Sequence, residues 1–149
     1  MRENSPLPLL IELAQNERDA ILRQIVTAQC LLADNEAQLK SLQTYHSEYL
    51  SRLSRNSHNK ASQLRNFHEF LSKLEIAITQ QAGAVEQHRQ RVKALEPELT
   101  QVNIKIKSYE VLHEKRLQAS TQQAQRQERK LEDEHAARVA RTPLVFGTR

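Results

Sequence analysis

Apolar residues recur at alternating steps of three and four through the first third of the chain. Ten of the thirteen residues in this series are apolar, and the series comprises Ile11, Ala14, Arg18, Ile21, Ile25, Ala28, Leu32, Asn35, Leu39, Leu42, His46, Tyr49 and Leu53. A mean step of about 3.5 residues is the heptad repeat of a coiled coil, whose a and d positions pack against another helix. With Ile11 at a and Ala14 at d, the pattern predicts one long helix with a continuous packing seam.

A second series with the same spacing follows a polar interruption. It comprises Leu64, Phe67, Leu71, Leu74, Ile78, Gln81, Val85, His88, Val92, Leu95, Leu99, Val102, Ile106 and Tyr109. Continued past Tyr109, the same count falls on polar residues, although the helical composition continues to about Arg141. The pattern therefore predicts a second, longer helix that ends in a polar overhang.

The polar interruption predicts where the chain turns, because its sequence, "SRNSHNKASQ", holds nothing that a core would bury. We expect a single domain over 1–149, with a first helix at about 6–55, a turn at about 56–61, a second helix at about 62–141 and a frayed tail at 142–149. Pro97 falls inside the second helix. It predicts a kink, because it removes one backbone hydrogen bond and its ring crowds the carbonyl of Lys93.

The lengths of the two seams match if the chain folds back on itself. Antiparallel pairing of a against d sets Leu53 opposite Phe67 and Ile11 opposite Tyr109, which we call the unshifted register. A register shifted by one heptad is also compatible with the sequence. In both cases the fold class is all-α, with two long helices forming an antiparallel coiled-coil hairpin.

Four of the six aromatic residues flank the predicted turn. Tyr49 and Phe67 are seam residues and are expected in the core. Tyr45 and Phe70 are at g positions, which line one edge of an antiparallel pair. We define the g edge near the turn as Leu31, Gln38, Tyr45, Phe70, Ala77 and Ala84. Such edges normally carry Glu and Lys, so these residues either widen the core or, as we favour, form a contact site.

Composition supports a helical chain and limits the other classes. There are two glycines, no tryptophan, 27% charged residues and a net charge of +4. Basic and acidic residues intermix, which favours a solvated helical surface over a nucleic-acid stripe. The single cysteine, Cys30, fits a reducing compartment. No apolar run approaches the about 20 residues of a membrane span, so we expect a soluble cytoplasmic protein.

No group of residues predicts catalysis. No histidine has a second ligand four residues away, and there is no cysteine pair or glycine-rich phosphate loop. We therefore expect no enzyme activity, cofactor, metal or small-molecule substrate. The polar seam residues, such as Asn35 and Gln81, are expected either to fix the register or to loosen the packing of the two helices.

Four segments carry a likeness to a known family. They read "LIELAQNERDA", "QLKSLQTYHSEYLSRL", "NFHEFLSKLEIAITQQ" and the basic close "KRLQASTQQAQRQERKLEDEHAARVAR". Together they resemble the flagellar FliJ family of export-apparatus proteins over nearly the whole chain, although Pro97 is not expected from that family. The resemblance implies an antiparallel coiled coil similar to the central stalk of rotary ATPases. It also implies a cytoplasmic protein that meets the inner membrane only through the export apparatus.

The resemblance further implies partners and binding residues. Family members bind the ring-forming export ATPase, link it to the cytoplasmic domain of the export gate FlhA, and handle export chaperones. The gate-binding motif would carry over to Gln38, Leu42, Tyr45, Tyr49, Phe70, Leu74 and Ala77. For the ATPase, the candidates are the overhang cations Arg116, Arg126, Arg129, Lys130 and Arg138.

Two other functions stay open at this point. One is the equivalent stalk of a virulence-type injectisome, which the genomic neighbourhood would distinguish. The other is an RNA-binding hairpin, suggested by cations around the turn, namely Arg52, Arg55, Lys60 and Arg65. RNA binding would weaken steeply with salt.

Overall fold

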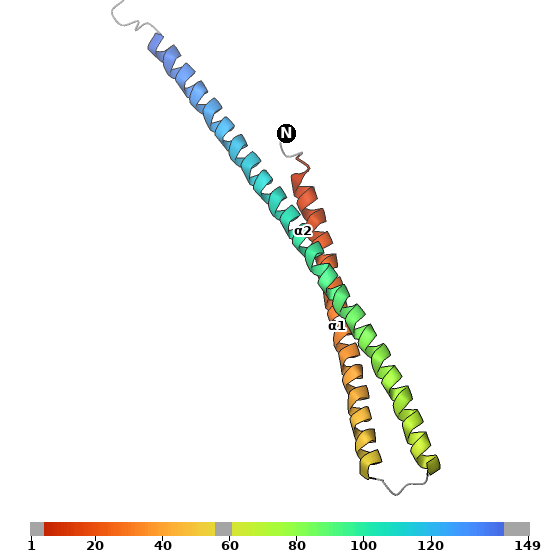
Figure 1. Cartoon of the computed structure of the whole chain (residues 1–149). Helices are drawn as coiled ribbons and strands as arrows, with labels where there is room; N and C mark the ends of the chain where they lie inside the picture. Colours follow the sequence, from red (N-terminus) through yellow and green to blue (C-terminus); the bar gives the residue numbers. More distant parts are fainter. Residues whose placement is uncertain (1–4, 56–60, 142–149) are drawn as a thin grey trace, which may run out of the picture. The chain divides into compact units, whose positions relative to one another are not determined.

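The computed structural model describes residues 5–55 and 61–141, which form two α-helices. Helix α1 spans Leu7–Arg55 and helix α2 spans Ala61–Arg141 (Figure 1). The described residues include no strand, so the predicted all-α fold class is confirmed. The predicted tail lies outside the described residues, as does the predicted turn apart from Ala61, which already belongs to α2.

The start of α1 has a polar cap. The backbone N–H of Leu7 donates to Ser5 Oγ at 3.4 Å, and the N–H of Leu10 donates to the carbonyl of Pro6 at 3.0 Å. Prolines are tolerated here, because the first helical N–H groups have no partner within the helix.

Helix α2 continues through Pro97 without interruption. The proline therefore does not end the helix, while the expected kink stays a prediction.

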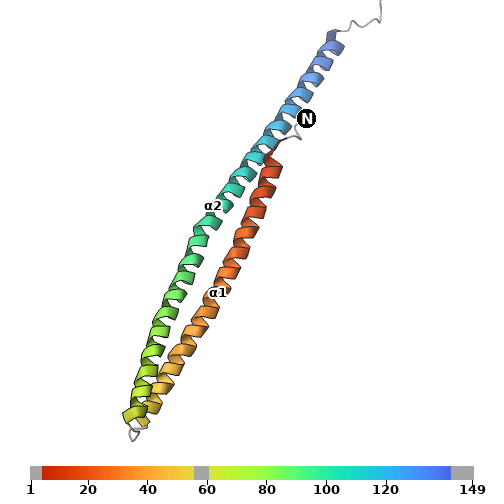
Figure 2. The ribbon, with the colours of Figure 1, turned by 90° about the vertical axis from the view of Figure 1, so that its right-hand side faces the viewer.

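The chain forms two units, and each contains part of both helices. One unit is Gln15–Asn103, and the other combines Met1–Ala14 with Ile104–Arg149. Within Gln15–Asn103 the two helices run antiparallel and pack along their seams (Figure 2). This arrangement is the helical hairpin that the two heptad series predict.

Burial follows the heptad seams in both helices. Every residue of the two predicted series is buried or half-buried, from Ile11 to Leu53 and from Leu64 to Tyr109. Leu95 is fully covered, with 0% of its surface exposed. Many seam residues stay half-buried because two helices alone cannot enclose each other's packing face. The periodicity is thus confirmed as the determinant of the core.

Two side-chain contacts establish the register. His46 Nε2 lies 3.2 Å from Glu75 Oε1, and the ring centroids of Tyr49 and Phe70 are 4.4 Å apart. Each partner on α2 is one residue away from the position that the unshifted register expects. A shift by one heptad would move the expected partners by a further seven residues, so the contacts fit the unshifted register.

The unit that contains both the start of α1 and the end of α2 has a short core and a long exposed segment. Leu7, Ala14 and Ile106 are buried there. Every residue from Thr121 to Arg141 is exposed, although α2 remains helical throughout this range. The predicted polar overhang of the second helix is therefore confirmed.

Neither helix, over the residues described, is apolar enough along its length to cross a bilayer.

Candidate functional site

The g positions of the two helices share one edge of the hairpin. Arg91 Nη2 donates to Gln24 Oε1 at 3.5 Å, and both residues are at g. On the opposite edge, Arg89 Nη2 lies 3.6 Å from Glu36 Oε1, and both of these are at e. The two contacts agree with the antiparallel geometry, in which g faces g and e faces e. The g edge defined from the sequence is therefore one continuous side of the molecule between Gln15 and Asn103.

Aromatic rings connect the core to this edge near the end of α1 and the start of α2. The Tyr49 ring lies 5.2 Å from that of Phe67 at an interplanar angle of 57°, and 4.4 Å from that of Phe70 at 31°. Tyr49 and Phe67 are half-buried, whereas Phe70 is 40% exposed and Tyr45 is 59% exposed. Tilted ring pairs of this kind contribute about 0.5–1.5 kcal/mol beyond the area they bury. The half-buried Tyr49 ring therefore supports Phe70, while part of the Phe70 ring stays exposed at the surface.

The residues predicted to bind the export gate lie in two layers. Gln38, Tyr45 and Phe70 are exposed, while Leu42 and Tyr49 are half-buried in the seam. Leu74 is buried, with 8% of its surface exposed. The seven residues therefore include surface groups and the groups that support them.

Ala77 differs from the expectation that it faces outward. It is half-buried, as is the neighbouring g residue Ala84. A methyl group does not reach past the longer side chains around it, so a g position alone does not make an alanine exposed.

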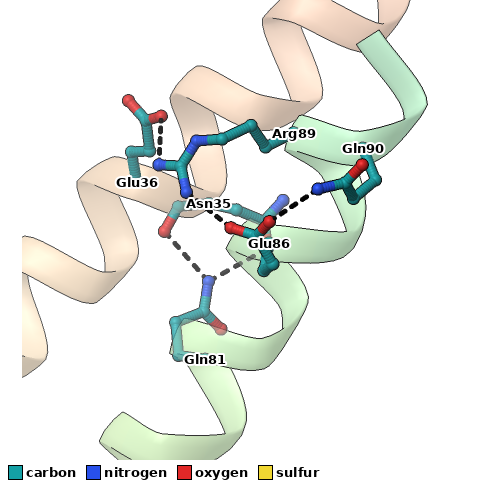
Figure 3. A network of polar contacts seen from close by, with 6 residues as sticks. All are labelled: Asn35, Glu36, Gln81, Glu86, Arg89 and Gln90. Atoms are coloured by element: carbon teal, nitrogen blue, oxygen red, sulfur yellow. Dashed lines mark hydrogen bonds and ion pairs between the residues drawn. The ribbon is translucent and has the colours of Figure 1, made fainter. Parts of the chain in front are cut away.

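A polar pair within the seam joins the helices next to this surface. Gln81 Nε2 donates to both the backbone carbonyl and Oδ1 of Asn35, each at 3.0 Å (Figure 3). Asn35 Nδ2 in turn donates to the carbonyl of Leu31 at 2.7 Å. These bonds use the amide nitrogens of both residues and Oδ1 of Asn35, and they match the register-fixing role expected for polar seam residues.

A charged network lies beside this pair. Arg89 Nη1 donates to Glu86 Oε2 at 2.7 Å, and Gln90 Nε2 donates to Glu86 Oε1 at 2.8 Å (Figure 3). The hydrogen bond from Gln90, followed by the one from Arg89, lowers the pKa of Glu86 below its ordinary value. The network is exposed to solvent and connects to α1 through Glu36, so it supports helix pairing on the e edge.

The five overhang cations predicted for ATPase binding are all exposed on α2. Arg126, Arg129 and Lys130 are spaced i, i+3 and i+4, so they share one helix face. Arg116 lies about 15 Å before Arg126 along the helix axis and Arg138 about 12 Å after Lys130, so neither joins this group. The structure therefore brings three of the five together.

The structure describes three of the four cations that were suggested for RNA binding. Arg52 and Arg55 are in the last turn of α1, Arg65 is exposed on α2, and Lys60 lies outside the described residues. Over residues 5–55 and 61–141, no three His, Cys, Asp or Glu side chains gather as metal ligands.

One group of surface residues was missed by sequence reasoning. Ile104, Val111 and Leu112 are exposed on α2 beside Lys107 and Lys115, around a shallow hollow of about 470 Å³. Their i, i+7, i+8 spacing was visible in the sequence. It was masked by the stronger heptad seam on the other side of the same helix.

A comparison with known protein families finds one that matches nearly the whole chain. The family described as flagellar FliJ protein matches residues 3–144. No curated protein and no solved structure matches the chain.

Proposed function

The chain belongs to the flagellar FliJ family, and from this premise we propose that it is a stalk-like link between the export ATPase ring and the export gate FlhA. As a family member it is a component of the flagellar protein export apparatus. The family consists of export-apparatus proteins that are not known as enzymes. Beyond this membership, we propose that the protein binds specific partners through specific surfaces and is located in the cytoplasm at the inner-membrane export apparatus.

The observation that carries the gate-binding part is the exposed aromatic surface beside the turn. Tyr45 and Phe70 project from different helices onto the same edge, and both keep at least two-fifths of their surface exposed (59% and 40%). Exposed aromatic side chains are costly to leave in water and are enriched among the residues that dominate protein interfaces. We assign Gln38, Tyr45 and Phe70 to direct contact with the FlhA cytoplasmic domain.

The buried members of the predicted set have a supporting role in this proposal. Leu42, Tyr49 and Leu74 belong to the seam, and the Tyr49 ring packs directly against Phe70. They hold the contact residues in place and would not touch the gate themselves.

The ATPase part of the proposal concerns the overhang of α2. A helix that is exposed on all sides from Thr121 to Arg141 leaves its whole circumference available to a ring-shaped partner. Arg126, Arg129 and Lys130 supply a cationic face for acidic groups of that partner. Handling of export chaperones is proposed on the family resemblance, without specific residues.

The gate contact is tested with Tyr45→Ala and Phe70→Ala combined in one variant. We expect binding to the purified FlhA cytoplasmic domain to fall at least tenfold in a pull-down or by calorimetry, while the far-ultraviolet circular dichroism stays helical. The matched control is Val26→Ala with Ile76→Ala, which removes one exposed apolar side chain from each helix away from the g edge. Equal gate affinity of the two double variants would refute the assignment.

A further inference from the structure

A groove on the g edge lies well away from the aromatic surface. It has a volume of about 440 Å³, and residues of both helices line it. Its lining includes Ala20, Arg23, Ala28 and Leu31 of α1 and Arg91 of α2. The groove is a feature of the paired helices and would not exist on either helix alone.

Small side chains give the groove its floor. Ala28 is buried and Ala20 is half-buried, so neither short side chain projects far into the groove. Leu31 forms an apolar wall and is 45% exposed. Close approach over small residues, with an aliphatic wall beside them, is a geometry in which a helix packs well.

The residues that line the groove give it a net positive charge. Arg23 and Arg91 line it from the two helices, and none of its lining residues is acidic. Arg91 donates a long hydrogen bond, 3.5 Å, to the neutral side-chain amide of Gln24. The nearby Asp19 carboxylate is held by Arg18, at 3.2 Å from both Nε and Nη2. A carboxylate brought by a partner would therefore meet two guanidinium groups.

We propose that this groove docks an acidic amphipathic helix of a partner protein. The carboxylates of that helix pair with Arg23 and Arg91, and its apolar residues pack on Ala28 and Leu31. The α1 residues that line the groove extend from Ala20 to Leu31, about 17 Å along the axis, which accommodates three turns of a partner helix. Two cations over an aliphatic floor suit a protein segment better than a nucleic acid, which is bound by many phosphate contacts.

The groove and the proposed gate contact can be disrupted separately. Leu31 at the end of the groove is fourteen residues from Tyr45, about 21 Å along α1. The inference therefore concerns a second binding site and does not depend on the FlhA assignment.

The test selects helical peptides against the full chain. The probe is a displayed library of about 18-residue helix-stabilised peptides, randomised on one face. We expect the enriched peptides to combine Asp or Glu with Leu, Ile or Val at helical spacing. Their affinity should fall at least tenfold for Arg23→Gln with Arg91→Gln, and it should fall with rising salt concentration. Circular dichroism establishes that the double variant still folds.

The matched control is Lys40→Gln with Arg65→Gln, which removes one exposed cation from each helix outside the groove. Binding by the selected peptides should be unchanged in this control. The proposal is overturned if nothing is enriched, if the enriched peptides show no acidic preference, or if both double variants bind equally. Competition by single-stranded RNA at micromolar concentration would also overturn it, because the groove would then be a general polyanion site.

Discussion

At the scale of single residues, Tyr49 shows how one side chain serves both the core and the surface. It is a seam residue, half-buried, and its ring contacts both Phe67 and Phe70. Its neighbour on the g edge, Tyr45, is more exposed than any of these three rings. Two tyrosines four residues apart in sequence therefore differ in what their removal would change.

We predict that Tyr49→Ala destabilises the folded chain by about 2 kcal/mol. This is less than the about 3–5 kcal/mol of a fully buried aromatic residue, because the Tyr49 side chain is only half-buried. Tyr49→Phe should be nearly neutral, since the ring contacts remain. Urea denaturation followed by circular dichroism measures both effects. An equal loss of stability for Tyr45→Ala would contradict the distinction drawn between the two tyrosines.

Glu86 provides a prediction about pH. Its pKa is lowered by the hydrogen bonds from Gln90 and Arg89, so the carboxylate form is favoured in the folded chain. For a lowered acid pKa, the stabilising effect is present above the unfolded value and is lost as the pH falls through the folded value. NMR titration should give a Glu86 pKa below that of an unperturbed glutamate, and Gln90→Ala should raise it. A pKa that Gln90→Ala leaves unchanged would show that the amide contact has no effect in solution.

Exposure at the residue scale was only partly predictable. The heptad assignment located Tyr45 and Phe70 on the exposed edge correctly, because long side chains at g reach beyond the seam. It failed for Ala77, whose short side chain is covered by its surroundings. The groove between Arg23 and Arg91 was also missed, since its cations belong to different helices and meet only in the paired structure.

At the scale of the helices, the core was predictable almost completely. A step of about 3.5 residues leaves only one face on which apolar groups accumulate, and the observed burial follows that face in both helices. Arg18 is the instructive case. It occupies a seam position yet remains only half-buried, with its guanidinium turned to Asp19. A long aliphatic stem can fill a seam position while its charge stays near water.

The register could not be derived from the seams, because a shift by one heptad also pairs apolar residues with apolar residues. The difference lies in a few polar contacts between the helices. Asn35 with Gln81, and His46 with Glu75, form hydrogen bonds that a shifted pairing would lose. Their geometry depends on both helices together, so single-helix periodicity does not reveal it.

We predict that Asn35→Leu with Gln81→Leu leaves the chain equally stable or stabilises it by about 1–2 kcal/mol, but broadens the register. An apolar pair removes the desolvation cost of two amides, and it also removes the contact that is specific to one alignment. Spin labels in place of Gln43 and Ala82, which are exposed e residues of α1 and α2, would report the alignment by pulsed electron paramagnetic resonance in a Cys30→Ser background. A shift by one heptad moves the helices by about 10 Å, so a second distance population should appear.

The control for this experiment is Leu39→Ile, a seam substitution that conserves volume and polarity. It should keep a single distance population. If the double variant also keeps one population, the Asn35–Gln81 bonds do not select the register.

At the scale of the whole molecule, the candidate surfaces belong to different units. The aromatic surface and the Arg23–Arg91 groove are in Gln15–Asn103, whereas the overhang cations are in the unit that holds the end of α2. A link between two large partners requires separate surfaces of this kind. The division also means that the overhang cations can be removed without removing the two surfaces of Gln15–Asn103.

The overhang has to be stable as a helix without burying any of its residues. Glycine and proline are absent between Thr121 and Arg141. Arg129 and Asp133, Lys130 and Glu134, and Glu134 and Arg138 follow i, i+4 spacing. Such pairs stabilise an exposed helix by about 0.2–0.5 kcal/mol each. The segment therefore maintains its helix through local interactions, which leaves its surface free for binding.

We predict that ending the chain after Ser120 abolishes binding to the export ATPase while the hairpin and FlhA binding are retained. Every described residue that this removes is exposed, so the thermal midpoint should change by no more than a few degrees. The variant with Arg126→Gln, Arg129→Gln and Lys130→Gln should weaken ATPase binding at low salt and keep α2 at full length. Pull-downs with each purified partner measure both variants.

ATPase binding by the shortened chain at normal affinity would exclude the overhang as the contact. Loss of both partners at once, with a lowered midpoint, would instead show that the overhang supports the fold, contrary to its complete exposure.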